Sequence, residues 1–175
     1  MSKALHMNYR DAVVSKIVRP QKAKVGKTFD AWITQESPVW QRRCVVQLRR
    51  YLHLECDYGM SFDDSFECWK SLEVFPFLDQ FFDDSRHEFR QWMIGAVCFS
   101  RATDSPLLEF CWLHPFWRNQ GLLARAWPGF VKHFGKFEIR KGQSRLTSIA
   151  SSLAKLILRT GCSFTRRIAR VTLPS

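Results

Sequence analysis

Apolar residues along this chain follow two different spacings, which predict two kinds of element. Residues 92–99 and 107–113 are near-continuous apolar runs, separated by the polar turn of residues 103–106. Two such runs joined by a short turn predict a β-hairpin. Because the runs are apolar almost throughout, both faces of the sheet they form are expected to be covered by other elements.

Helical spacing follows this hairpin. Seven apolar positions recur every three or four residues and predict a helix with one broad apolar face. These positions are 122, 123, 126, 127, 130, 131 and 134. Pro128 cannot donate a backbone hydrogen bond to Ala124, so a kink or an early end is also predicted. A second helix is predicted over residues 39–54, with Ser37 as its N-cap and Pro38 at its first position.

The remaining segments complete an alternating order of elements. Residues 29–34 and 137–139 are predicted as short strands, residues 147–160 as a helix, and residues 162–173 as a final strand or strand pair. Residues 57–88 are acidic and aromatic, which suggests short helices or a loop-rich lid. The fold class predicted from this order is α+β, with a mainly antiparallel central sheet flanked by helices.

Composition supports a folded domain that carries its charge at its ends. The 175 residues are 46% hydrophobic and include 15 Phe, 7 Trp and 3 Tyr, which argues against a disordered basic protein. The formal net charge is +11. Residues 1–27 have 7 basic and 1 acidic side chains, residues 28–131 have 10 and 14, and residues 132–175 have 10 and 1. We therefore expect a basic arm or edge element at residues 1–27 and one domain over residues 28–175.

No segment reaches the 18 to 20 apolar residues of a membrane span, and the first residues do not form the apolar core of a signal peptide. The chain is expected to be cytoplasmic, without a membrane partner. A basic surface attracts phosphates, so nucleic acid bound through the basic ends is one partner that the charge allows.

The cysteines predict reduced thiols without a metal. The six cysteines include no Cys-x-x-Cys pair, and a disulfide framework is not expected. His53 and Cys56 form one close pair, with Cys44 and Cys68 each twelve residues from Cys56. A structural zinc site usually brings two close pairs, so we predict no metal site here and interpret these residues as unrelated.

The loop between the second apolar run and the helix has the composition of a diphosphate site. It contains Arg118 and Gly121 and leads directly into the helix. The first amide groups of a helix have no partner within the helix, and the helix dipole is positive there. Glycine permits close approach of a ligand, and arginine adds a full charge. The alternative interpretation is an ordinary turn between a strand and a helix.

Residues 113–123, Leu-His-Pro-Phe-Trp-Arg-Asn-Gln-Gly-Leu-Leu, resemble the signature of the GNAT superfamily of acyl-CoA-dependent N-acyltransferases. That signature is Gln/Arg-x-x-Gly-x-Gly/Ala, often preceded by Val/Leu-x-Pro-x-x-Arg. Leu123 stands where glycine or alanine is usual. The resemblance covers residues 92–134 closely and residues 28–173 more loosely.

The resemblance implies a GNAT-like fold and acetyl-CoA as the co-substrate. It implies that the backbone of Leu113 contacts the pantetheine arm and that the following loop holds the pyrophosphate. The residues implied in cofactor binding are Leu113, Arg118, Asn119, Gln120, Gly121, Leu122 and Leu123.

Three residues are candidates for catalysis. Glu109 is the only charge in residues 107–113 and is expected on the face of Leu107, Cys111 and Leu113, where it would act as a base or face solvent. His114 either titrates near neutral pH or closes the turn.

The acid that would protonate the leaving thiolate is the third catalytic role. The family's usual acid is a tyrosine on the helix after the fifth strand, but Tyr9, Tyr51 and Tyr58 all lie upstream. Ser148 is the candidate acid in its place, or else an N-cap.

The predicted activity is transfer of an acetyl group to an amine by direct attack on the thioester. The alternative is a GNAT-like protein that binds acyl-CoA or nucleic acid without catalysis. The amine acceptor stays open: the basic ends favour an acidic acceptor, such as an aminoacyl-tRNA or an acidic protein surface. The acidic residues 57–88 favour a cationic amine or a protein lysine instead.

Overall fold

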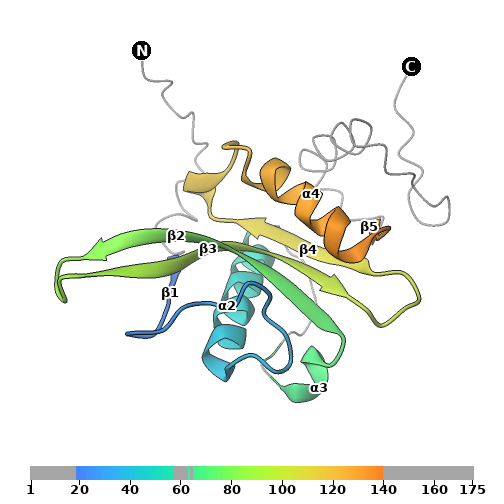
Figure 1. Cartoon of the computed structure of the whole chain (residues 1–175), viewed down its shortest axis with the longest axis horizontal. Helices are drawn as coiled ribbons and strands as arrows, with labels where there is room; N and C mark the ends of the chain where they lie inside the picture. The colour runs from blue at the N-terminus through green and yellow to red at the C-terminus, as the bar shows by residue number, and fades with distance from the viewer. Residues whose placement is uncertain (1–18, 57–62, 64, 140–175) are drawn as a thin grey trace, which may run out of the picture.

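The computed structural model describes residues 19–56, 63 and 65–139. These residues form a five-stranded sheet with a helix on each face, an α+β fold, as predicted (Figure 1). The strands are β1 (Gln21–Lys22), β2 (Leu72–Asp83), β3 (Glu88–Ser100), β4 (Leu107–Leu113) and β5 (Glu138–Ile139). Strand β3 is central: β2 pairs with one of its edges, and β1 and β4 pair with the other.

The sheet is antiparallel except at one edge, where β5 runs parallel to β4. Leu107 and Leu108, the first two residues of β4, pair with Glu138 and Ile139. A parallel pair needs a crossover connection, which α4 (Leu122–Phe134) supplies. The predicted hairpin of β3 and β4 and the predicted short strand near residue 138 are confirmed.

Strand β2 corrects the expectation of a loop-rich lid over residues 57–88. Within the described part of this segment, α3 (Phe66–Trp69) is a short helix, as one of the two expectations had it, and β2 pairs with β3 over its full twelve residues. Its side chains alternate between two cores, because Val74 packs on one face of the sheet and Phe75 and Phe77 pack on the other. Pro76 is tolerated because β2 lies at the edge of the sheet along this stretch.

Helix α2 (Val39–Cys56) confirms the helix predicted over residues 39–54, and it covers one face of the sheet. Its buried residues Val45, Leu48 and Leu52 recur at helical spacing and pack with residues of β3 and β4. The predicted N-cap is wrong: the Ser37 hydroxyl donates to Asp30 at 2.5 Å and accepts from the Thr34 amide at 3.1 Å.

The predicted strand over residues 29–34 is reduced to a single β-bridge. Ile33 pairs with Val74 of β2, and the two residues exchange backbone hydrogen bonds of 2.8 and 2.9 Å. Phe29 and Ile33 are buried beneath α2, and the Asp30 side chain is bonded to Gln41 of that helix. The alternation that suggested a strand therefore reflects two anchoring side chains in a loop.

Helix α4 covers the opposite face, where it packs its apolar residues against an aromatic core (Figure 1). The helix runs through Pro128 to Phe134, so the expectation of an early end is wrong. Phe99 of β3 fixes the last turns, since its ring lies 5.4 Å from that of Phe130 and 4.3 Å from that of Phe134. Gly135 ends the helix with a positive φ of 68°.

The described helices do not include one that is long and apolar enough to cross a membrane. Residues Gln21–Lys22 of the expected basic arm pair with β3 and so belong to the sheet. The predicted elements at residues 147–160 and 162–173 lie outside the described residues.

Candidate functional site

The turn from β4 into α4 is shaped by its backbone. His114 precedes the 3-10 turn η1 (Pro115–Trp117), and its Nδ1 accepts a hydrogen bond from the Phe116 amide at 3.3 Å. Asn119 and Gly121 then adopt positive φ values of 61° and 71°. This conformation favours glycine, and asparagine tolerates it best among the other residues. The loop is therefore a defined turn that aims the start of α4.

The first turn of α4 presents backbone N–H groups at this loop. The first intrahelical bond runs from the Arg125 amide to the Gly121 carbonyl at 3.0 Å, so the amides of residues 122–124 precede it. Gly121 is the N-cap and gives no side-chain capping bond, and the first turn holds no acidic residue. Leu122 and Leu123 direct their side chains to the aromatic core. The leucine at 123 is thus accommodated by the core.

The backbone of Arg118 belongs to this loop, but its side chain is bonded to α2. Its guanidinium makes a bidentate ion pair with Glu55 of α2, at 2.5 Å from Nη1 and 2.6 Å from Nη2. Its Nε donates to the Leu113 carbonyl at 2.8 Å. The Trp112 indole Nε1 donates to the same Glu55 carboxylate at 2.9 Å. One carboxylate at the end of α2 therefore ties together the end of β4 and the loop.

Leu113, the predicted pantetheine contact, ends β4 directly opposite Gly95 of β3. A Cβ atom on Gly95 would lie 2.5 Å from Leu113 Cδ2 and 2.6 Å from the Trp112 carbonyl oxygen. Glycine at 95 therefore lets the end of β4 lie close against β3. The Leu113 carbonyl is already an acceptor for Arg118.

Glu109 lies at a β-bulge, where the regular alternation that grouped it with Leu107, Cys111 and Leu113 is broken. Cys98 pairs with Phe110 whereas Phe99 pairs with Leu108, so Glu109 is the extra residue. Both Cys98 and Phe110 pack on the α2 face. Burial raises the pKa of the Cys98 thiol, and the charge of Glu109 adds to that increase.

Cys111 and Leu113 pack on the opposite, α4 face. The alternation that grouped them with Glu109 therefore fails at the bulge, because one extra residue reverses the faces of all that follow.

His114 lies at the junction of β4 and the loop, as predicted, and only 2% of it is exposed. Its amide donates to the Ile94 carbonyl at 2.8 Å, and its ring packs against Trp117 with 4.9 Å between centroids. These contacts make His114 the residue that closes the turn.

Some predicted sites are tested only in part. Ser148 lies outside the described residues. Among the described residues, no three His, Cys, Asp or Glu side chains are grouped so that they could hold a metal.

Cys44, Cys98 and Cys111 are buried free thiols, and burial raises the pKa of Cys44 to about 11 and that of Cys111 to about 12. Cys98 and Cys111 thus pack as apolar residues, as predicted.

Glu55 and Arg125 are residues of the candidate site that the sequence pattern did not indicate. Glu55 is an acid at the end of a helix, where the helix dipole disfavours negative charge, and this was the one available signal. Arg125 lies in the first turn of α4, and its Nη1 donates to the Gln120 carbonyl at 2.8 Å.

Comparison of the chain with protein-family models, with curated proteins and with solved structures gave no match.

Proposed function

We propose that the protein is an acetyl-CoA-dependent N-acetyltransferase, with the loop from Arg118 and the first turn of α4 as its pyrophosphate site. The observation that supports this most is the β4–α4–β5 unit. In it a crossover helix begins at the carboxyl end of β4, and β5 lies parallel to the other end of β4. Ligands of such units bind beyond the carboxyl ends of the strands, at the start of the helix.

The loop and helix offer the chemistry that a diphosphate needs. The amides of residues 122–124 lie at the positive end of the helix dipole, and the left-handed Gly121 has no Cβ to obstruct a ligand. The pantetheine arm then follows the backbone of β4 from Leu113 toward the bulge. Four residues of strand span about 13 Å, so an arm that enters at Leu113 reaches Glu109.

Transfer begins when the nitrogen of a neutral amine attacks the thioester carbonyl carbon. A C–N bond forms, the C–S bond breaks, the ammonium proton leaves with a base, and the coenzyme departs as thiolate. Glu109 is the base in this proposal, because it is the carboxylate of β4 and lies at the bulge, where the regular backbone pairing is interrupted. His114 is assigned to the turn because its Nδ1 caps η1.

The acceptor class follows from the charge on α2, which lies between the first and second strands. This helix carries four arginines, of which Arg43 and Arg50 are exposed, and its one acid is Glu55. Glu55 is engaged by Arg118 and Trp112. A basic helix on this face of the sheet favours an amine that is carried by an acidic molecule.

The test is calorimetric titration of the full chain with acetyl-CoA, followed by an assay for released thiol. Two sets of amines are compared: acidic ones, such as amino-terminal Asp and Glu peptides or aminoacyl-tRNA, and cationic ones, such as polyamines and lysine peptides. We expect binding of acetyl-CoA and thiol release with the acidic set. Absence of acetyl-CoA binding would refute the proposal.

A second candidate is binding of acyl-CoA without transfer. Tyr51 is the tyrosine among the residues that the structure describes. It is buried in the core beside α2, where its hydroxyl accepts a hydrogen bond from Gln21 at 3.3 Å, so it is not placed to protonate the leaving thiolate. Binding of acetyl-CoA together with no thiol release over both sets of amines would support this second candidate over the first.

A further inference from the structure

The Glu55–Arg118 pair occupies a place where a ligand contact was expected. All three guanidinium nitrogens of Arg118 have partners, Nε on the Leu113 carbonyl and the two Nη atoms on Glu55. The guanidinium also lies over the Trp112 ring, 5.8 Å from its centroid. The side chain of Arg118 is 27% exposed and that of Glu55 is 12% exposed. The hydrogen-bonding groups of Arg118 are thus engaged by other residues of the protein.

We propose that Arg118 is a positioning residue, which Glu55 holds against the end of β4, and that Arg125 supplies the side-chain charge for the pyrophosphate. This rests on the proposed function, since it divides the roles within the same acyl-CoA site. Arg118 fixes the Leu113 carbonyl and the entry to the loop. Arg125 and the amides of α4 meet the phosphates.

Electrostatics favours this division. To reach a phosphate, Arg118 has to leave a carboxylate that is largely buried. Removing one partner of a buried ion pair leaves an uncompensated charge, which is strongly unfavourable. Glu55 also lies at the carboxyl end of α2, where the helix dipole opposes a negative charge. Its bidentate bond to Arg118 offsets that opposition, so the pair is expected to persist when a ligand binds.

Arg125 has the opposite situation. It is exposed, and its Nη1 donates to the neutral carbonyl of Gln120. The same Nη1 would lie 3.4 Å from a Cβ atom placed on Gly121, so the guanidinium lies beside that glycine. Turning from a carbonyl to a phosphate leaves no buried charge behind. Its place over Gly121, beside the amides of residues 122–124, puts a full positive charge at the dipole's positive end.

The experiment compares two ligands that differ in phosphate. Coenzyme A carries the pyrophosphate, whereas pantetheine ends before it. Binding of each to the full chain is followed by NMR, with the Trp112 indole N–H as the reporter. The variants are R118A, R118K, E55Q and R125A, each checked for a native thermal transition.

If Arg118 positions β4, R118A and E55Q weaken coenzyme A and pantetheine by the same factor. R118K, which keeps the charge but loses the bidentate geometry, weakens both as well. R125A weakens coenzyme A by about tenfold, the value of one charge-assisted bond, and leaves pantetheine unchanged.

The proposal is overturned if R118A weakens coenzyme A alone, or if R118K retains wild-type affinity, because either result makes Arg118 a phosphate ligand. It is also overturned if R125A has no effect on coenzyme A. Should R118A fail to fold, R118K and E55Q decide between the two roles. If the wild-type protein binds neither ligand, the proposed function itself has failed. If the wild-type protein binds both ligands but the variants do not separate coenzyme A from pantetheine, only the division of roles between Arg118 and Arg125 has failed.

Discussion

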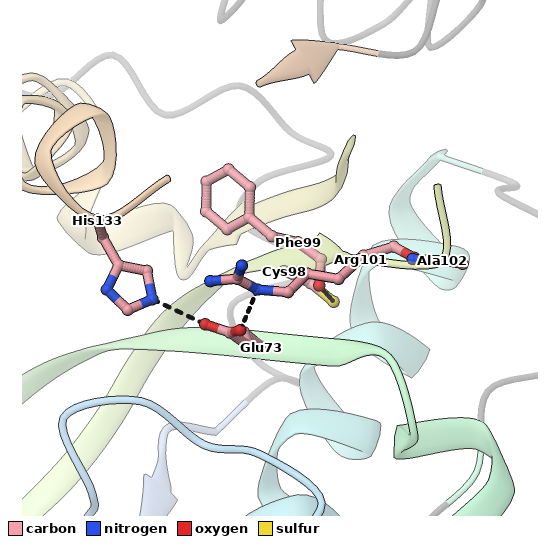
Figure 2. Close-up of polar contacts among 7 residues, drawn as sticks. Glu73, Cys98, Phe99, Arg101, Ala102 and His133 are labelled. Carbon is pink, nitrogen blue, oxygen red and sulfur yellow. Dashed lines mark hydrogen bonds and ion pairs between the residues drawn. The ribbon is translucent and has the colours of Figure 1, made fainter. Parts of the chain in front are cut away.

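Glu73 of β2 accepts a hydrogen bond from His133 of α4 at 2.8 Å, and this bond joins the edge of the sheet to the last turn of the helix (Figure 2). The second carboxylate oxygen of Glu73 pairs with Arg101, which follows β3. The His133 ring stacks on Trp32 with 4.3 Å between centroids. Three elements that are distant in sequence therefore meet at one carboxylate.

This carboxylate makes stability depend on pH. Partial burial raises the pKa of Glu73, but the hydrogen bonds and charges of His133 and Arg101 outweigh it, so the pKa is below its usual 4.5. A lowered pKa stabilises the folded state at pH values above the unfolded pKa, and this contribution is lost as the pH falls through the folded one. We expect E73Q to lower the free energy of unfolding by about 0.5 to 1 kcal/mol at pH 6, and by less at pH 3.

Urea denaturation of wild type and E73Q at both pH values measures this difference. Glu36 is an exposed carboxylate and provides the control variant E36Q. A deficit of E73Q that stays equal at pH 3 and pH 6 would contradict the ion-pair interpretation.

Gly95 is expected to tolerate no side chain. A Cβ at 95 would meet the backbone oxygen of Trp112 at 2.6 Å, and a backbone atom in a sheet cannot move aside cheaply. Gly95→Ala should lower the free energy of unfolding by about 1 to 3 kcal/mol, the usual range for overpacking. Gly129 in α4 is the matched control, since a Cβ there meets nothing within 4 Å.

Gly129→Ala should raise stability by up to about 1 kcal/mol, because alanine is the better helix former. The two variants therefore shift the thermal midpoint in opposite directions. A G95A protein as stable as wild type would mean that β3 and β4 are less closely paired than the structure has them.

The buried thiols should resist alkylation. The pKa of Cys44 is raised to about 11 and that of Cys111 to about 12, both by burial. Thiolate is the reactive form, so these thiols and Cys98 should react with iodoacetamide only after denaturation, whereas the half-buried Cys68 reacts earlier. Peptide mapping by mass spectrometry distinguishes the sites. Modification of Cys98 before Cys68 in native buffer would contradict the packing of the core.

The sequence predicted the elements whose patterns are strong and unbroken. The β3–β4 hairpin and α4 follow from continuous or helical apolar spacing that the sheet and the core both require. Strand β2 was missed because acidic residues such as Glu73 and Asp79 break its apolar alternation. These residues are explained only by partners elsewhere: His133 bonds to Glu73, and the Trp117 indole bonds to Asp79 at 2.9 Å.

The turn from β4 into α4 was predicted in its position along the chain, but the side-chain geometry around it was not. A bulge at Glu109 reverses the faces of the residues that follow, and no residue type in β4 predicts a bulge at that position. Glu55 and Arg118 are 63 residues apart, and the ion pair between them depends on how α2 packs on β4. Local pattern specifies backbone elements, whereas such pairs are set by tertiary packing.

Gly121 gives the most direct test of the proposed phosphate site, because the effect of its backbone conformation on stability can be separated from its proposed effect on ligand binding. Its φ of 71° is left-handed, and Gly26, in a turn before α2, has a similar φ of 65°. Alanine at either position should lower stability by about 1 to 2 kcal/mol, the cost of a Cβ in this conformation. Neither Cβ would meet a neighbour closer than 3.4 Å, so strain is the shared effect.

The two variants should differ in ligand binding. To relieve the strain in G121A, the turn must rotate, and this redirects the amides of residues 122–124 away from the phosphates. We therefore expect calorimetry to show acetyl-CoA affinity reduced by at least tenfold in G121A and unchanged in G26A, at matched loss of stability. Equal affinities in the two variants would place the phosphate site away from α4, because a left-handed Gly121 would then serve only to start the helix.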